Sequence, residues 1–235
     1  MDAARFLPRI LGPYDLTGVS YSAAGARLSY VFAMRGPCVV FDTACSSSLI
    51  AMHVARRCMQ HRECSDALCI GANAILHSGT HVGPAFTGMT SARGQCHTFD
   101  SRGDGYLRGE ACGAILLGVE VSALSSGACL GSSARHNGQS ASFTALNGLS
   151  QQLLLRAALR DGTMDLATVL EAHGTGTALG DPIEVSAISA IVSSGGTCCV
   201  FSIKGNVGHT ESTAGVAGVL ELTKILRGNE GVQNA

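Results

Sequence analysis

The chain is poor in charged and aromatic side chains. Of its 235 residues, 14% are charged and 5% are aromatic, tryptophan is absent, and the formal net charge is −1. This neutrality excludes a nucleic-acid binder that depends on bulk positive charge, and a hydrophobic content of 46% excludes a disordered chain. Thirty glycines and so few large rings favour a compact core built from small side chains.

Metal-binding, secretory and membrane signals are also missing. No two of the ten cysteines are spaced as C-x-x-C, which leaves a zinc ribbon or a thioredoxin-type site without support. Residues 1–13 contain no recognisable secretory leader, so we expect a reducing, cytoplasmic compartment in which most thiols are small buried hydrophobic groups. The apolar stretch 185–203 approaches bilayer length, but serines and glycines at 193–196 interrupt it, and no membrane span is expected.

A unit of strand, polar turn and helix occurs twice along the chain. In the first unit, residues 38–42 are expected to form a strand and a helix to open near Cys45. In the second, residues 198–203 predict a strand, 204–209 a loop and 212–227 a helix. Alternating strands and helices indicate α/β layering, and the repeated unit hints at an internal duplication.

Other elements are predicted from apolar runs and helix-end signals. Three near-continuous apolar runs predict strands buried on both faces of a parallel sheet, over 67–76, 114–119 and 167–172. Residues 151–160 predict a helix that stops at Gly162. A further helix is expected to begin at Asp181, with this aspartate as its N-cap and Pro182 at its first position.

The segment DTACSSSL at 42–49 places a cysteine at the turn between a predicted strand and a helix. Free backbone N–H groups and the helix dipole at such a turn favour the thiolate, which makes Cys45 a candidate nucleophile. The run of small serines that follows allows close helix packing and leaves space above the sulfur. The alternative is that Cys45 is one more structural cysteine.

The segment EAHGTGTALGDP at 171–182 places His173 at the end of a predicted strand, before a glycine loop. Its glycines allow a close approach of the backbone to a ligand. A dinucleotide-binding loop is the alternative, but the fingerprint G-x-G-x-x-G requires a glycine where this chain has Leu179.

A second histidine ends a glycine loop in the segment SIKGNVGHTE at 202–211. His209 follows Lys204 by five residues and precedes Glu211 by two. Either histidine alone would more commonly be a hydrogen-bonded structural residue. Together with Cys45 they form a Cys/His/His constellation at the strand ends where open α/β sheets place their sites. The six remaining histidines are expected at the surface or in packing.

The chain resembles the β-ketoacyl synthase domains of polyketide synthases, with animal-type fatty acid synthase as near kin. The resemblance is carried by DTACSSSL at 42–49, GEACGA at 109–114, EAHGTGTALGDPIE at 171–184 and KGNVGHTESTAGVAGVLE at 204–221. It implies an α/β fold of thiolase-like, layered αβαβα type with duplicated halves, truncated at both ends. Residues 1–126 would belong to the first half and 127–235 to the second, fused into one domain.

The resemblance also implies roles for the constellation. Cys45 would accept the acyl group, His173 and His209 would act on the extender, and Lys204 and Glu211 would support the histidines as a nearby charged pair. The implied reaction is a decarboxylative Claisen condensation between an acyl-cysteine thioester and a malonyl-type thioester. Both substrates would be carried on the phosphopantetheine of an acyl carrier protein, with no metal and no bound cofactor.

Neutral imidazole N–H donors would stabilise the enolate oxygen that forms when carbon dioxide leaves. A homodimer is expected for the complete domain. The competing hypothesis is an inactive ketosynthase fragment or a dimer-forming interaction module. A thiolase is a weaker alternative, because no second cysteine motif of that family is present.

Overall fold

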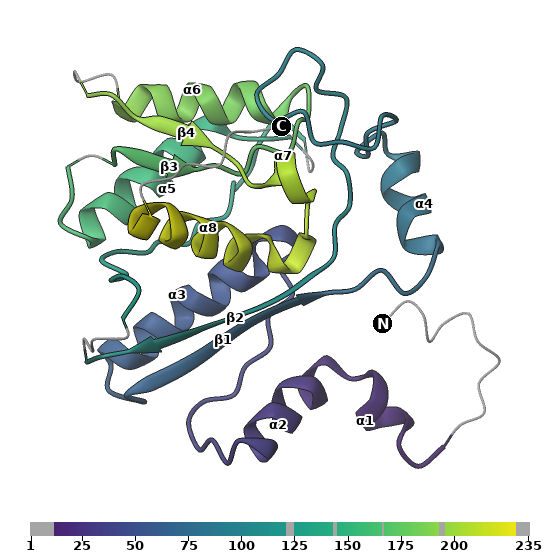
Figure 1. Ribbon diagram of the computed structural model, residues 1–235, viewed down its shortest axis with the longest axis vertical. Coiled ribbons are helices and arrows are strands. Elements are labelled where there is room, and N and C mark those ends of the chain that lie inside the picture. The colour runs from purple at the N-terminus through teal and green to yellow at the C-terminus, as the bar shows by residue number, and fades with distance from the viewer. Residues whose placement is uncertain (1–11, 121–124, 143–144, 166, 193–195, 229–235) are drawn as a thin grey trace.

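The computed structural model describes residues 12–120, 125–142, 145–165, 167–192 and 196–228 (Figure 1). The α-helices are α1 (Asp15–Val19), α2 (Tyr21–Val31), α3 (Ser47–Gln60), α4 (Gly79–Phe86), α5 (Gly148–Asp161), α6 (Gly180–Val192), α7 (Lys204–Val207) and α8 (Ala214–Gly228). The 3-10 turns η2 (Ala44–Ser46) and η3 (Glu211–Thr213) precede α3 and α8. The strands are β1 (Asp66–Asn73), β2 (Ala111–Gly118), β3 (Val169–Glu171) and β4 (Cys199–Phe201).

The strands form two separate pairs. β3 and β4 run parallel, whereas β1 and β2 run antiparallel with Asp66 opposite Gly118 and Asn73 opposite Ala111. The prediction of a parallel sheet buried on both faces is therefore wrong for β1 and β2. Alternate residues of β2 are exposed, Leu116 to 71%, so its apolar run covers one buried and one open face.

Helices α3 and α8 cover the same face of the β1–β2 pair. Val216 of α8 packs with Met52 of α3 and Cys69 of β1 in the buried core. A Cβ on Gly113 would lie 2.7 Å from Val216 Cγ1, so a larger side chain there would push α8 off the sheet. The backbone N–H of Val216 also donates to the buried Ser48 hydroxyl at 3.1 Å, which confirms that the small serines permit close helix packing.

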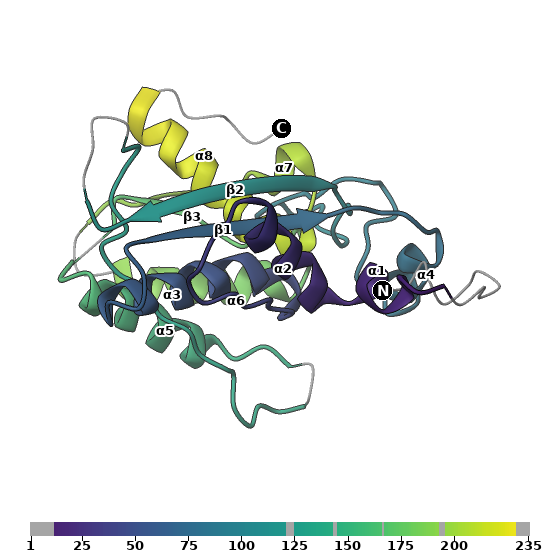
Figure 2. The same cartoon turned by 90° about the horizontal axis from the view of Figure 1, so that it is seen from below.

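The second strand pair lies on the other side of α8. A Cβ on Gly218 of α8 would lie 2.9 Å from Glu171 Cγ of β3, so this helix contacts both sheets. Helices α5 and α6 pack against each other beside β3 and β4 (Figures 1 and 2). The resulting layers of sheet, helix, sheet and helix agree with the layered α/β arrangement expected from the sequence.

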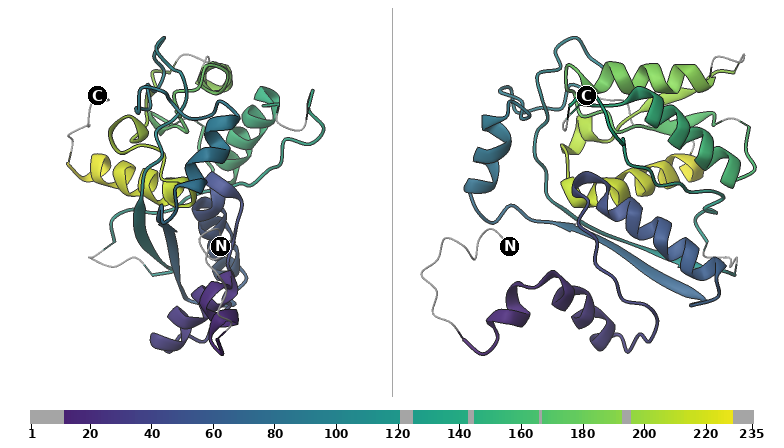
Figure 3. Two further views of the ribbon diagram at one scale, coloured as in Figure 1. Left: turned by 90° about the vertical axis from the view of Figure 1, so that its right-hand side faces the viewer. Right: turned by 180° about the vertical axis from the view of Figure 1, so that it is seen from behind.

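Residues 38–42 do not form the expected strand. No backbone hydrogen bond joins them to another described segment, and Val39 and Val40 are 60% and 43% exposed. A strand needs a neighbour to satisfy its N–H and C=O groups, and no described strand pairs with this segment. It leads instead from α1 and α2, which extend away from the rest of the described chain (Figure 3), to the turn at η2.

The helix predictions hold with shifted boundaries. α5 is capped by the Asn147 side chain, which accepts from the N–H of Ser150 at 3.1 Å, and it ends at Gly162 as expected. α6 begins one residue before Asp181, whose role as N-cap is a wrong prediction. Its carboxylate instead accepts N–H groups of Gly176 and Phe99, which tie down the loop before the helix.

Residues 204–207 form a helical turn rather than a loop. The part of the stretch 185–203 at 193–195, like most of residues 1–13, lies outside the described residues. Among the residues that the structure describes, no helix combines the length and apolar character needed to cross a membrane.

Candidate active site

Cys45 lies in the turn η2, immediately before α3. Ala44 adopts a left-handed backbone conformation with φ of +53°, an uncommon conformation for an alanine. The Ser47 side chain holds this bend, since its hydroxyl donates to the Ala44 carbonyl at 2.6 Å and accepts the Thr43 N–H at 2.9 Å. The bend turns the thiol toward the two histidine loops.

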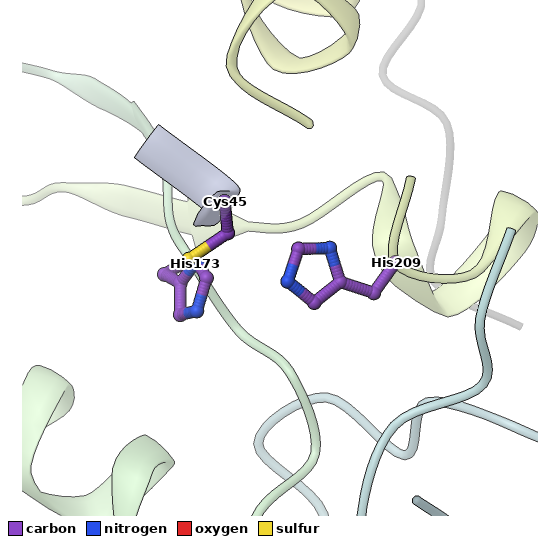
Figure 4. A group of neighbouring side chains, drawn as sticks. All are labelled: Cys45, His173 and His209. Atoms are coloured by element: carbon purple, nitrogen blue, oxygen red, sulfur yellow. The ribbon is translucent and has the colours of Figure 1, made fainter. Parts of the chain in front are cut away.

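The structure brings the predicted trio together. One ligating atom from each of Cys45, His173 and His209 lies within 4.8 Å of the other two. The two imidazole rings stand nearly perpendicular, with centroids 5.4 Å apart, and the sulfur points toward His173 (Figure 4). Residues from three distant parts of the chain thus converge on one small volume.

The expectation that Cys45 rests as a thiolate is wrong. Burial raises the pKa of the Cys45 thiol, and the nearby Lys204 ammonium and a backbone hydrogen bond lower it by less. The loss of hydration on burial disfavours the charged form more than the turn stabilises it. Cys45 is therefore a thiol at neutral pH, and it needs a proton acceptor when it reacts.

The His173 loop is held through its backbone. The carboxylate of Glu184, in α6, accepts the N–H groups of His173 and Gly174 at 2.6 and 2.8 Å. Gly174 has a positive φ of +44°, and a Cβ there would lie 2.6 Å from Thr98 Cγ2 and 2.8 Å from Ser202 Cβ. The glycine therefore admits the protein's own chain, not a ligand, to close approach. The His173 ring itself is exposed and carries no hydrogen bond from a described protein group.

The His209 loop is held through both backbone and ring. His209 donates its N–H to the Leu107 carbonyl at 2.6 Å and accepts the Gly109 N–H on its own carbonyl at 2.9 Å. The Glu211 N–H donates to Nδ1 of His209 at 3.1 Å. An imidazole nitrogen that accepts a hydrogen bond carries no proton, so neutral His209 has its proton on Nε2.

Both imidazoles are neutral at physiological pH. Burial, and to a lesser extent the positive charges of Lys204 and Arg108, lower the pKa of His209 to about 4. Loss of hydration around the His173 ring, and to a lesser extent the charge of Lys204 and the neighbouring His209, lower the pKa of His173 to about 3. Each ring can therefore donate one N–H without carrying a charge.

Lys204 and Glu211 do not pair with each other, which corrects the expected arrangement. Lys204 is only 4% exposed, and its charge interacts with the carboxylates of Glu171 and Glu184. Glu211 instead forms a bidentate ion pair with Arg108, at 2.5 and 2.8 Å. A planar guanidinium matches a carboxylate better than a single ammonium does, which explains the partner.

Sequence reasoning missed three charged residues around the trio. Glu171 and Glu184 are the first and last residues of the segment at 171–184, and Arg108 directly precedes the segment at 109–114. Their partners lie far away along the chain, as for Arg108 and Glu211, which are 103 residues apart. No local pattern identifies such a pair.

The thiol and the two imidazoles are groups that bind Zn²⁺ in other proteins. The hydrogen bonding here disfavours such a site. A metal bound to Nε2 of His209 would require the ring proton on Nδ1, where it would clash with the Glu211 N–H. Nδ1 is not free to bind a metal either, because it already accepts that N–H. The absence of a metal from this site stays a prediction.

The expectation that most other cysteines are buried is wrong. All ten are free thiols, yet only Cys69 and Cys96 are buried. Cys112, for example, lies on the open face of β2, where alternate side chains point away from the helices.

Comparison with family models matches almost the whole chain. The model described as "Beta-ketoacyl synthase, N-terminal domain" matches residues 8–123, and "Beta-ketoacyl synthase, C-terminal domain" matches residues 126–233. Similar curated proteins include one of the phenolphthiocerol/phthiocerol polyketide synthase polypeptides of Mycobacterium tuberculosis, 41% identical over 93% of this chain. The mycocerosic acid synthase-like polyketide synthase of Mycolicibacterium smegmatis is 36% identical over 95% of it. The chain spans only 10% and 11% of these relatives.

Solved structures of ketosynthases are also similar to this chain. The ketosynthase from module 6 of the bacillaene synthase of Bacillus subtilis 168 superposes with a TM-score of 0.84 at 33% identity. The match covers 89% of this chain and 39% of that one. The oxazolomycin ketosynthase domain of Streptomyces albus JA3453 gives a TM-score of 0.85, covering 97% of this chain and 43% of that one.

Proposed function

The chain belongs to the β-ketoacyl synthase family, with the thiolase-like fold of polyketide synthase ketosynthases, and we propose that it catalyses their decarboxylative Claisen condensation. The observation that supports this activity is the convergence of Cys45, His173 and His209 within 4.8 Å. A thiol and two neutral imidazoles are suited to acyl transfer followed by enolate stabilisation.

In the first step, Cys45 takes an acyl group from a carrier thioester. His173, whose ring nitrogens are not fixed by any described protein group, accepts the thiol proton while the sulfur attacks the carbonyl carbon. The bond between that carbon and the carrier sulfur breaks, and the departing thiolate takes the proton back from His173. The acyl group remains on Cys45, activated as a thioester.

In the second step, a malonyl-type thioester loses carbon dioxide beside the acyl-enzyme. The electron pair of the broken C–C bond forms an enolate, and the Nε2–H of His209 and an N–H of neutral His173 stabilise its oxygen. The carbanion then attacks the acyl carbonyl and expels Cys45 as a thiolate, which takes a proton from solvent. Neutral donors suit this step because the charge appears only as carbon dioxide leaves.

We further propose that both substrates arrive on the phosphopantetheine of an acyl carrier protein, and that no metal or other cofactor is bound. A homodimer and a cytoplasmic location are part of the same proposal. Polyketide synthesis is favoured over fatty acid synthesis because the similar proteins named above are polyketide synthases and their ketosynthases.

The test is product formation from an acyl-pantetheine and a malonyl-pantetheine thioester. We expect the chain to form a β-ketoacyl thioester, the Cys45→Ala variant to form none, and Cys112→Ala, which changes an exposed thiol, to match wild type. A folded chain that forms no product would contradict the proposal and favour an inactive ketosynthase fragment or a dimer-forming module.

A further inference from the structure

Residues 106–109 hold His209 in place. They lie in the segment that matches the N-terminal family model, whereas His209 lies in the segment that matches the C-terminal one. Arg108 and His209 form an isolated parallel β-bridge, flanked by the backbone hydrogen bonds to Leu107 and Gly109. The ring of Tyr106 stands edge-on to the His209 ring, with centroids 5.0 Å apart. The position of the histidine thus depends on this short segment.

The Arg108 side chain extends the same support to Glu211. Its side chain is 7% exposed, and the guanidinium binds the Glu211 carboxylate through Nε and Nη2. Glu211 has a left-handed backbone with φ of +47°, which costs a glutamate roughly 1 kcal/mol relative to ordinary conformations. A bidentate, largely buried ion pair is strong enough to hold that conformation.

The left-handed conformation of Glu211 accompanies the N–H contact to the ring. The Glu211 N–H meets Nδ1 of His209 two residues earlier, at 3.1 Å. This N–H lies in the peptide plane between Thr210 and Glu211, so a shift of the turn that the ion pair anchors would rotate that plane away from Nδ1, and no hydrogen bond would then select one tautomer of His209. The hydrogen bond, and with it the Nε2–H donor, depends on the ion pair.

We propose that Arg108 is a positioning residue for the condensation: by anchoring the turn at Glu211, it keeps the His209 proton on Nε2, facing Cys45 and the substrate. The catalytic consequence rests on the function proposed above. The effect on the His209 tautomer does not, because it is a property of the resting protein.

The first test reads the tautomer directly. In the chain labelled with ¹⁵N-histidine, His209 is assigned from the resonances that disappear in His209→Gln. At neutral pH we expect wild type to show Nδ1 without and Nε2 with a proton. Arg108→Met should give a mixture of both tautomers, and Arg108→Lys, which keeps the charge but not the fork, should lie between them.

The matched control is Arg102→Met. Arg102 also binds a carboxylate through two nitrogens, Asp100 at 3.0 and 2.8 Å, but its side chain is 59% exposed. We expect this variant to leave the His209 resonances and both reaction steps unchanged. An unchanged tautomer in folded Arg108→Met and Arg108→Lys would overturn the proposal whether or not the chain is active.

The second test separates the two steps of the reaction. Arg108→Met should lower malonyl decarboxylation roughly 10- to 100-fold and leave acyl transfer to Cys45 within about threefold of wild type. Because Arg108 acts through Glu211, the double variant with Glu211→Gln should be no slower than the slower single variant. Equal loss of both steps in folded protein, or additive losses in the double variant, would contradict the proposal. If Arg108→Met does not fold, Arg108→Lys and Glu211→Gln carry the same comparison.

Discussion

The two histidines beside Cys45 are held in opposite ways. His209 is 5% exposed and its Nδ1 accepts the Glu211 N–H, so both its position and its tautomer are fixed. The ring of His173 is exposed, and only its backbone is held, by the Glu184 carboxylate. A fixed tautomer makes His209 a permanent donor, whereas His173 can accept a proton in one step and donate in the next.

The largest expected effect tests the fixed donor. His209→Gln places an amide N–H near the position of Nε2, whereas His209→Asn ends near Nδ1. We expect malonyl decarboxylation to fall about 1000-fold in the asparagine variant and only about tenfold in the glutamine variant, because a missing donor costs this much at a developing oxyanion. Acyl transfer, measured on the same samples, should stay within about threefold. Equal losses in the two variants would refute the assignment of Nε2 as the donor.

Acid stability tests the lowered pKa of the two histidines. Unfolded histidine binds a proton below its ordinary pKa near 6.5, but folded His209 binds one only near pH 4. The free energy of unfolding should therefore decrease as the pH falls from 6.5 to 4, by roughly 3 kcal/mol from this residue. In urea titrations across that range, His209→Gln should flatten the decrease, and so should His173→Gln, because the pKa of His173 is lowered to about 3. A decrease that is unchanged in both variants would show that neither ring has a lowered pKa.

His173 should take part in both acyl transfer and decarboxylation. We expect His173→Gln and His173→Asn to lower decarboxylation about 100-fold and acyl transfer about tenfold, with little difference between the two, because a proton acceptor is lost in each. His61→Gln, an exposed residue in the turn after α3, is the control. Unimpaired acyl transfer in both variants would show that another group deprotonates Cys45.

The smallest effect should come from the backbone support of His173. Glu184→Gln keeps one acceptor oxygen of the two and leaves one N–H of the His173 turn without its partner. We expect kcat to fall about tenfold with KM nearly constant, since the loop shifts while the His209 donor stays in place. Glu120→Gln, at an exposed carboxylate, should behave as wild type. A larger loss than in the His173 variants would mean that Glu184 does more than hold this loop.

The trio could be predicted from sequence because each member lies in or beside its own recognisable turn motif. Its contacts confirm the predicted convergence, but not through the expected elements: residues 38–42 form no strand, and β1 and β2 are antiparallel. Apolar runs report that a segment is buried somewhere, not which partner or direction it takes. The choice of Arg108 rather than Lys204 as the partner of Glu211 likewise depends on distances between segments far apart in the chain.

The prediction that Cys45 is a thiolate was wrong for a related reason. A turn at a helix start predicts a stabilised thiolate when considered alone. The packing of the histidine loops around it removes water, and the raised pKa of Cys45 follows from that burial. Local motifs thus locate the reacting groups, and the tertiary contacts determine their charge.

Acyl transfer to Cys45 is the most direct test of the account. The chain is incubated with an acyl-pantetheine thioester, its intact mass is followed, and the modified residue is located by peptide mapping. The account predicts a single acyl addition on Cys45, absent in Cys45→Ala and retained in Cys112→Ala. A folded chain that gains no acyl group, or one that gains it equally after Cys45→Ala, would contradict the assignment of Cys45 as the nucleophile.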